Sequence, residues 1–162
     1  MGSRLQNLSR KINNFVWRLS AVFFIAMLLI VIFQILARYI FNSPPPWTAE
    51  AARYCMIWGG MLGSSVAFYF NKDPRLFEPP KNKSKIVNIM LSWARSTAVL
   101  LFIVPILLSS WEYLNRSAGR TTEILRIPSV LVTSAIPISI LLIFFHTIVH
   151  MIDSFSNGSE EA

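Results

Sequence analysis

Residues 19–40 read LSAVFFIAMLLIVIFQILARYI, an apolar block that only Ser20, Gln34 and Arg38 interrupt. A block of this length reaches the roughly 20 residues that an α-helix needs to cross about 30 Å of hydrocarbon. A secretory signal peptide has a shorter apolar core and a small-residue cleavage site, which this block lacks. We therefore expect the block to be retained as a membrane-spanning helix.

Three further apolar blocks follow along the chain, at residues 54–70, 97–108 and 130–145. The chain is 54% hydrophobic and only 14% charged, whereas a typical soluble domain is about 25% charged. The blocks also lack the polar stripe at period 3.6 that a soluble helical bundle needs. The sequence therefore predicts an all-α integral membrane protein that forms a single four-helix domain over residues 1–162. Its transmembrane helices are expected at about 18–41, 47–70, 93–114 and 128–151.

The positive charges predict how these helices are oriented. With the N-terminus inside, ten of the 15 Lys and Arg residues fall on the cytoplasmic side, and the first and third connections hold the other five. Because cytoplasmic loops carry an excess of Lys and Arg, both termini are expected in the cytoplasm. Tryptophans near the expected helix ends suit the headgroup level, and they are Trp17, Trp47, Trp93 and Trp111.

The segment before the third span, residues 73–96, allows two interpretations. It reads DPRLFEPPKNKSKIVNIMLSWARS, with Ile86, Ile89, Met90 and Trp93 on one helical face. This pattern suits a short amphipathic helix that lies in the cytoplasmic interface. A longer, tilted third helix whose Lys and Arg side chains reach the headgroups fits equally well.

Groups that would indicate chemistry inside the membrane are scarce. No Asp or Glu falls in the middle of an expected span, which argues against a chain that couples ions or protons by itself. His146 and His150 lie one turn apart on one helix, whereas a haem held by two histidines would need them on facing helices. Only Asp153 could add a third metal ligand, so we interpret the two histidines as interfacial side chains.

The remaining candidates for chemistry are equally sparse. Cys55 is the only cysteine, so no intramolecular disulfide is expected. The net charge of +7 sits at the ends of apolar blocks, as membrane orientation requires, and does not indicate a nucleic-acid partner. We therefore expect no catalytic residue, no metal site and no cofactor, and we do not expect an enzyme.

The second span carries a packing signal. Gly59, Gly63 and Ala67 are spaced by four residues, and small residues at this spacing let helices approach closely. The contact could lie within this chain or with a partner. Trp58 lies in the middle of the span, where it could face lipid. A position facing protein is favoured because its N–H would then have a partner.

Two prolines, Pro105 and Pro137, fall inside the third and fourth expected spans. Each removes one backbone N–H and is expected to kink its helix. Broken helices form substrate sites in some transporters. No ionisable group accompanies either proline, so plain kinks are the favoured interpretation.

The connection between the first two spans, residues 38–54, reads RYIFNSPPPWTAEAARY. The second helix can begin within the prolines, which lose no helical hydrogen bond there, or near Thr48 after an extended proline run. In either case Glu50 lies in its first turn, where the helix dipole favours an acid by roughly 0.3–1 kcal/mol. Arg53 follows on the same face, and Arg38 arrives at the same membrane level. The connection is thus either a stiff hairpin with solvated charges or a charged platform for a partner.

This connection, together with residues 57–67, IWGGMLGSSVA, resembles the small membrane subunit of tripartite ATP-independent periplasmic (TRAP) transporters, the DctQ-like family. Residues 119–139, GRTTEILRIPSVLVTSAIPIS, look like the family's Gly-x-Thr stretch that leads through an Ile-Pro into the last helix. The resemblance covers essentially the whole chain. It rests on the Arg-Tyr, Pro-x-Trp and Trp-x-x-Glu elements taken together, which involve Arg38, Tyr39, Trp47, Glu50, Arg53 and Tyr54.

The resemblance implies a definite assembly. In this family a soluble periplasmic binding protein captures an organic acid, and a large multi-span membrane subunit carries the substrate and sodium sites. The small subunit packs on the static scaffold of the large one. The chain would then be a non-catalytic, multi-pass subunit in a bacterial inner membrane, with the large subunit, the binding protein and the lipid bilayer as partners. Structural or partner-contact roles are expected for Arg38, Tyr39, Trp47, Glu50, Arg53, Tyr54, Trp58, Gly59 and Gly63.

Two other functions compete with this one. A small self-assembling, proton-coupled exporter of the multidrug type would need a carboxylate inside the membrane, and the expected spans offer none. A membrane-shaping or assembly factor without transport activity differs in another way, because its deletion would leave organic-acid uptake intact.

Overall fold

The computed structural model describes residues 2–70 and 85–159, and these residues form five helices. They contain no β-strand, only an isolated bridge between Thr121 and Pro128. The fold of the described chain is therefore all-α. The helices are α1 (Gly2–Phe41), α2 (Trp47–Tyr69), α3 (Lys85–Ala118), α4 (Val130–Thr133) and α5 (Ala135–Ser159).

Helix α1 is much longer than a membrane crossing requires. Its 40 residues correspond to about 60 Å at 1.5 Å per residue, roughly twice the hydrocarbon thickness. From Ser3 to Phe41 the sequence holds no Gly or Pro, so nothing in the chain interrupts the helix. The segment before the first expected span is therefore helical and is available for packing.

Three helical stretches are long and apolar enough to cross a membrane, namely Leu5–Phe41, Trp93–Ala118 and Val130–Ile152. Helix α2 is not among these three, because Glu50, Arg53 and several Gly and Ser residues lower its mean hydropathy. It packs between α1 and α5, so part of its surface meets protein instead of lipid. The prediction of a fourth crossing stays a prediction for α2.

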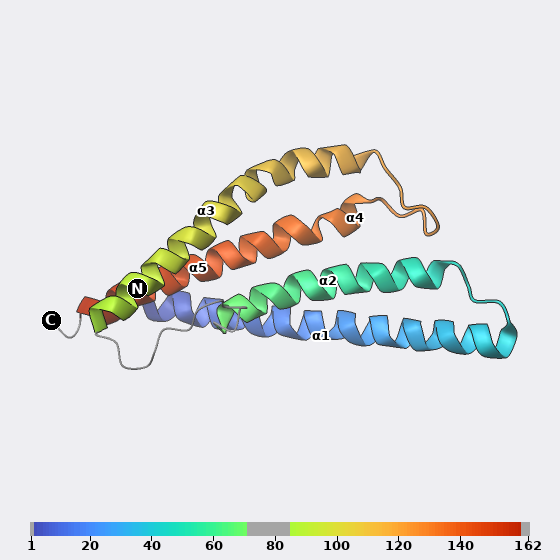
Figure 1. Ribbon diagram of the computed structural model, residues 1–162, viewed down its shortest axis with the longest axis horizontal. Helices are drawn as coiled ribbons and strands as arrows, with labels where there is room; N and C mark the ends of the chain where they lie inside the picture. The colour runs from blue at the N-terminus through green and yellow to red at the C-terminus, as the bar shows by residue number, and fades with distance from the viewer. Residues whose placement is uncertain (1, 71–84, 160–162) are drawn as a thin grey trace.

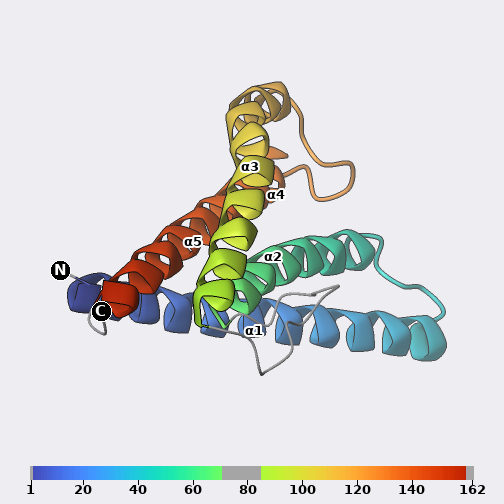
Figure 2. The ribbon, with the colours of Figure 1, turned by 60° about the vertical axis from the view of Figure 1, so that its left-hand side comes forward.

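The helices are arranged as an open row and not as a closed four-helix bundle. Helix α2 packs against α1 on one side and α5 on the other, and α3 packs against α5 and α4 (Figure 1; Figure 2). One hydrophobic cluster, around Val16, Leu62 and Val66, joins α1 to α2, and Leu142 of α5 packs against it. A second cluster joins α3 to α5 through Ile103, Ile140 and Ile143. Helices α1 and α3, at the two ends of the row, keep much of their apolar surface exposed.

Helix α3 runs without a break from Lys85 to Ala118. Of the two interpretations of the segment before the third span, the described residues therefore give the longer helix, and residues 73–84 lie outside them. Pro105 lies inside α3, and the helix is curved along its length (Figure 1). A proline inside a helix removes one hydrogen bond and causes such a bend.

The last helical stretch is interrupted near its start. Helix α4 ends at Thr133 and α5 begins at Ala135, with Pro137 as the third residue of α5. Because Pro137 has no N–H, the carbonyl of Thr133 lacks its usual helical donor. The Ile138 N–H still reaches the Ser134 carbonyl at 3.2 Å, so the helix resumes at once. The start of α1 and the end of α5 lie at the same end of the molecule (Figure 1).

Candidate functional site

The connection between α1 and α2 is a short, stiff turn. Asn42 follows α1 with a φ of 51°, the left-handed conformation that often ends a helix and that Asn tolerates. Helix α2 then begins at Trp47, directly after Pro46. The Thr48 hydroxyl donates to the Pro45 carbonyl at 2.7 Å. This bond closes the turn and fixes the direction in which α2 leaves it.

Glu50 joins the start of α2 to the connection between α3 and α4. One carboxylate oxygen, Oε2, accepts hydrogen bonds from the backbone N–H of Ile124 at 3.0 Å and of Leu125 at 2.8 Å. The other oxygen, Oε1, accepts a hydrogen bond from the Tyr54 hydroxyl. The residue is only 7% exposed. Three donors directed at one carboxylate favour its ionised form. We call this arrangement the Glu50 clasp.

The segment that the clasp holds is a narrow hairpin-like loop over residues 119–129. The Thr122 N–H donates to the Ile127 carbonyl at 2.9 Å, and the Ser129 N–H donates to the Arg120 carbonyl at 2.9 Å. Arg126 turns the chain with a φ of 52°. The amides at the tip point to Glu50, while the side chains of Ile124 and Leu125 are exposed. The clasp therefore presents two apolar side chains at this end of the molecule.

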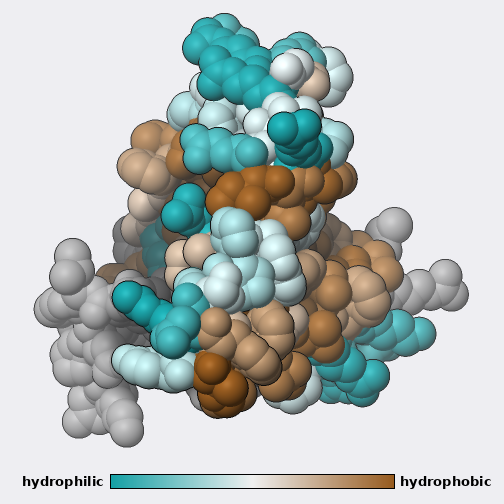
Figure 3. All heavy atoms as spheres, turned by 90° about the vertical axis from the view of Figure 1, so that its right-hand side faces the viewer, coloured by the Kyte–Doolittle hydropathy of each residue, from teal (hydrophilic) through white to brown (hydrophobic). Residues whose placement is uncertain are grey.

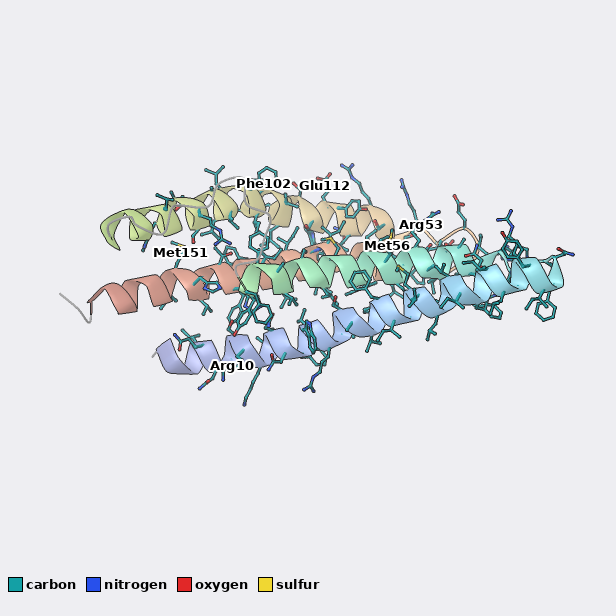
Figure 4. All side chains as sticks on the ribbon, turned by 60° about the horizontal axis from the view of Figure 1, so that its bottom comes forward. Arg10, Arg53, Met56, Phe102, Glu112 and Met151 are labelled. Atoms are coloured by element: carbon teal, nitrogen blue, oxygen red, sulfur yellow. The ribbon has the colours of Figure 1, made fainter. Side chains whose placement is uncertain are left out.

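The three charges that the sequence places around the turn do not form one exposed group. Arg38, in the last turn of α1, and Arg53, on α2, are exposed, whereas Glu50 is buried in the clasp. Figure 4 shows Arg53 on α2 toward the end that carries the loops. Seen end-on in Figure 3, this face mixes hydrophilic and hydrophobic surface. This end of the molecule therefore exposes arginine side chains close to apolar side chains.

The aromatic residues of this region differ in their exposure and in their contacts. Trp47 stacks on Phe33 of α1, with ring centroids 6.2 Å apart, and remains partly exposed. Tyr39 is 79% exposed. Trp58 faces protein, because it stacks on Phe23 and its Nε1–H donates to the Leu131 carbonyl at 3.1 Å. Trp58 thereby joins α1, α2 and α4.

The small residues of α2 permit a close approach to α1. A Cβ added at Gly59 would lie 3.3 Å from the Phe24 ring, and one at Gly63 would lie 3.2 Å from Ser20 Oγ. The Ser20 hydroxyl donates to the Gly59 carbonyl at 2.8 Å. In contrast, a Cβ at Gly60 would meet nothing within 4 Å. The close contact at Gly59 and Gly63 therefore lies within this chain.

The backbone amides that bind Glu50 are the part of the site that the sequence does not predict. The loop amides that bind Glu50 carry no side-chain signal, since every residue except proline has an N–H. The described residues contain no group of three or more His, Cys, Asp or Glu that could hold a metal ion. The site is thus a hydrogen-bonded clasp beside an exposed surface.

Comparisons with known proteins identify the family that the chain resembles. Residues 27–157 match the family model described as "Tripartite ATP-independent periplasmic transporters, DctQ component". A curated relative, the "Sialic acid TRAP transporter permease protein SiaT" of Haemophilus influenzae (strain 86-028NP), is 34% identical over 91 residues. The match covers 52% of this chain but only 14% of the relative. The chain is therefore similar to one small part of a much longer permease.

Proposed function

The chain belongs to the DctQ component family of tripartite ATP-independent periplasmic transporters, and we propose that it is the non-catalytic small subunit of a sodium-coupled transporter for organic acids. As a member of this family it is a small membrane subunit of a secondary transporter. In our proposal it packs on the scaffold of a large multi-span subunit and stabilises it. A periplasmic substrate-binding protein delivers the organic acid to the assembly.

The observation that carries the proposal is the relation to the sialic acid permease. The matched stretch makes up only 14% of that relative, so a similar stretch occurs there within a much larger membrane polypeptide. This supports a large membrane protein as the partner of the present chain. Sialic acid is an organic acid, which supports that substrate class for the assembly.

The distribution of charge supports a role without ion coupling. The stretches Leu5–Phe41 and Val130–Ile152 contain no Asp or Glu. The only acid in the stretch Trp93–Ala118 is Glu112, which is exposed near its end and paired with Arg116. Substrate and sodium binding in the membrane would require polar or charged groups within a span. In our proposal these groups belong to the large subunit.

We further propose that the chain crosses a bacterial inner membrane four times with both termini in the cytoplasm. Helix α2 is then a crossing: its 23 residues amount to about 34 Å at 1.5 Å per residue. It also runs back along α1 (Figure 1). In this orientation the turn at residues 42–46 and the loop at 119–129 face the periplasm. The Glu50 clasp would shape the surface on which the binding protein docks.

The open row of helices supports the proposed packing on a larger subunit. The long apolar faces of α1 and α3 have little cover from the rest of the described chain. Such faces suit lipid or another membrane protein. A homodimeric exporter finds no support in the described helices, because no carboxylate lies in the middle of a candidate span.

The test is affinity purification of the tagged chain from native membranes in mild detergent, followed by reconstitution. We expect co-purification of a much larger multi-span protein, and sodium-driven uptake of an organic acid only when that protein, the chain and the binding protein are present together. Recovery of the chain as a stable homodimer, with full transport by the large subunit alone, would overturn the proposal. Proton-driven export by the purified chain alone would favour the exporter instead.

A further inference from the structure

Polar side chains from three helices meet at the end of the molecule opposite the loops. Ser9 comes from α1, Tyr69 from α2, and His146 and His150 from α5, and we call them, with Asn13 one turn after Ser9 on the same face of α1, the polar cluster. His146 and Asn13 are each only 1% exposed. Buried polar groups of this kind are normally hydrogen-bonded.

Two contacts in the polar cluster hold His146 in place. Its Nδ1 lies 2.9 Å from the Ser9 hydroxyl oxygen, and its ring meets the Tyr69 ring edge-on with centroids 5.2 Å apart. His150 Nε2 lies 3.1 Å from the Tyr69 backbone carbonyl, so this second histidine is bound to the end of α2. Helices α1, α2 and α5 are thereby linked through the cluster.

Two buried atoms in this region have no hydrogen-bond partner among the described residues, Asn13 Oδ1 and His146 Nε2. Asn13 lies one turn after Ser9 on the same face of α1. Further along, Leu142 of α5 packs against the hydrophobic cluster that contains Val16 of α1. Because α1 and α5 run in opposite directions (Figure 1) and Ser9 contacts His146, Asn13 lies one turn from this contact, on the side that leads toward Leu142. Both unpartnered atoms therefore belong to the same contact between α1 and α5.

We propose that this contact holds a bound water molecule that bridges Asn13 Oδ1 and His146 Nε2. When the Ser9 hydroxyl donates to Nδ1, the ring proton lies on Nε2, and the water accepts from Nε2–H and donates to Oδ1. When Nδ1–H donates to Ser9, Nε2 is an acceptor, and the water donates to both atoms. A water molecule thus fits either tautomer.

Other small ligands fit this pair of atoms less well. A metal ion would need further ligands, and the described residues contain no group of three His, Cys, Asp or Glu. An anion would be repelled by the amide oxygen of Asn13. Buried waters typically make about three hydrogen bonds to polar groups that lack other partners. The bridging water would fix the N-terminal part of α1 against α5.

The proposal predicts the sign of a stability change, measured on the full chain in lipid nanodiscs. With the water in place, Asn13→Leu removes one of its partners and leaves His146 Nε2 poorly bonded, so the apparent melting temperature should fall by at least about 2 °C. If the site were dry, replacing an unpartnered buried amide by an apolar group of similar size would be neutral or stabilising.

Two further variants control this measurement. Asn14 is exposed and adjacent on the same helix, so Asn14→Leu should leave the melting temperature unchanged. Asn13→Ser keeps a hydroxyl and leaves room for the water, so its melting temperature should fall less than that of Asn13→Leu. This variant keeps the test informative if Asn13→Leu fails to fold. A high-resolution structure should show a density peak within hydrogen-bond distance of both atoms. A direct hydrogen bond between Asn13 and His146, or an unchanged or raised melting temperature in Asn13→Leu, would overturn the proposal.

Discussion

The carboxylate of Glu50 lies 2.8 Å from the backbone nitrogen of Leu125, although 75 residues separate them in the chain. This hydrogen bond joins the start of α2 to the loop that precedes α4. Because the acceptor is charged and buried, the bond belongs to the stronger class of protein hydrogen bonds. The relationship makes Glu50 a residue that holds this end of the molecule together.

Replacing Glu50 by Gln should destabilise the chain. The amide keeps one acceptor oxygen but loses the charge and places an NH₂ group against donors. Hydrogen bonds to charged groups are stronger than those between neutral groups, and we expect the apparent melting temperature to fall by several degrees in detergent or nanodiscs. Glu123→Gln is the matched control, because Glu123 lies on the same loop and is exposed. Equal melting of both variants would contradict the role of the clasp.

Removing the Tyr54 hydroxyl should have a smaller effect. Tyr54→Phe loses the single hydrogen bond to Glu50 Oε1 and keeps the ring, so we expect a cost of about 1 kcal/mol. The double variant with Glu50→Gln should cost less than the sum of the single variants, because both act on one network. Tyr39→Phe, at a 79% exposed side chain, serves as the control. Strict additivity would show that the two side chains act independently.

The approach of α1 to α2 should be sensitive to side-chain size at Gly59 and insensitive at Gly60. In Gly59→Leu the side chain would meet Phe24 and Phe23 of α1, and such overpacking typically costs about 1–3 kcal/mol. Gly60→Leu meets open space in this chain. Thermal unfolding of the isolated chain should therefore separate the two variants. A larger loss for Gly60→Leu would place the helix contact on the other face of α2.

The sequence predicts the helices and the turn because their signals are local. Apolar blocks predict the membrane helices, and the proline run predicts where α1 gives way to α2. The position of Glu50 in the first turn of α2 follows from the same local pattern. The partners of Glu50 cannot be predicted in this way, because backbone amides are present at nearly every position. The amide of Ile124 is 74 residues away in the chain and comes close to Glu50 only in the folded structure.

The histidines illustrate a second limit of local patterns. The sequence predicts interfacial positions for His146 and His150, because they lie one turn apart on one helix and only Asp153 could add a third metal ligand. In the structure α1 begins at Gly2, so Ser9 reaches α5 and lies 2.9 Å from His146. The burial of His146 depends on this extension of α1 beyond the apolar block.

The indole N–H of Trp58 should contribute measurably to the packing of α2 against α4. Trp58→Phe keeps an aromatic ring against Phe23 but loses the hydrogen bond to the Leu131 carbonyl. We expect a cost of about 1 kcal/mol, measured as a lower melting temperature. Trp111→Phe is the control, because Trp111 is 72% exposed. No difference between the two variants would mean that the hydrogen bond does not stabilise the fold.

Arg53 should affect partner binding rather than folding. Its side chain is exposed at the end that carries the loops, so Arg53→Ala should leave the melting temperature of the chain unchanged. In the proposed assembly this end faces the soluble binding protein, and charges at the rim of an interface mainly change the association rate. Docking of the binding protein to the reconstituted complex should weaken several-fold at low ionic strength. The difference should shrink in about 1 M salt, where the Debye length falls to about 3 Å.

Arg10→Ala, at the opposite end of the molecule (Figure 4), should not change docking. Equal affinity of wild type and Arg53→Ala at every salt concentration would remove Arg53 from the docking surface.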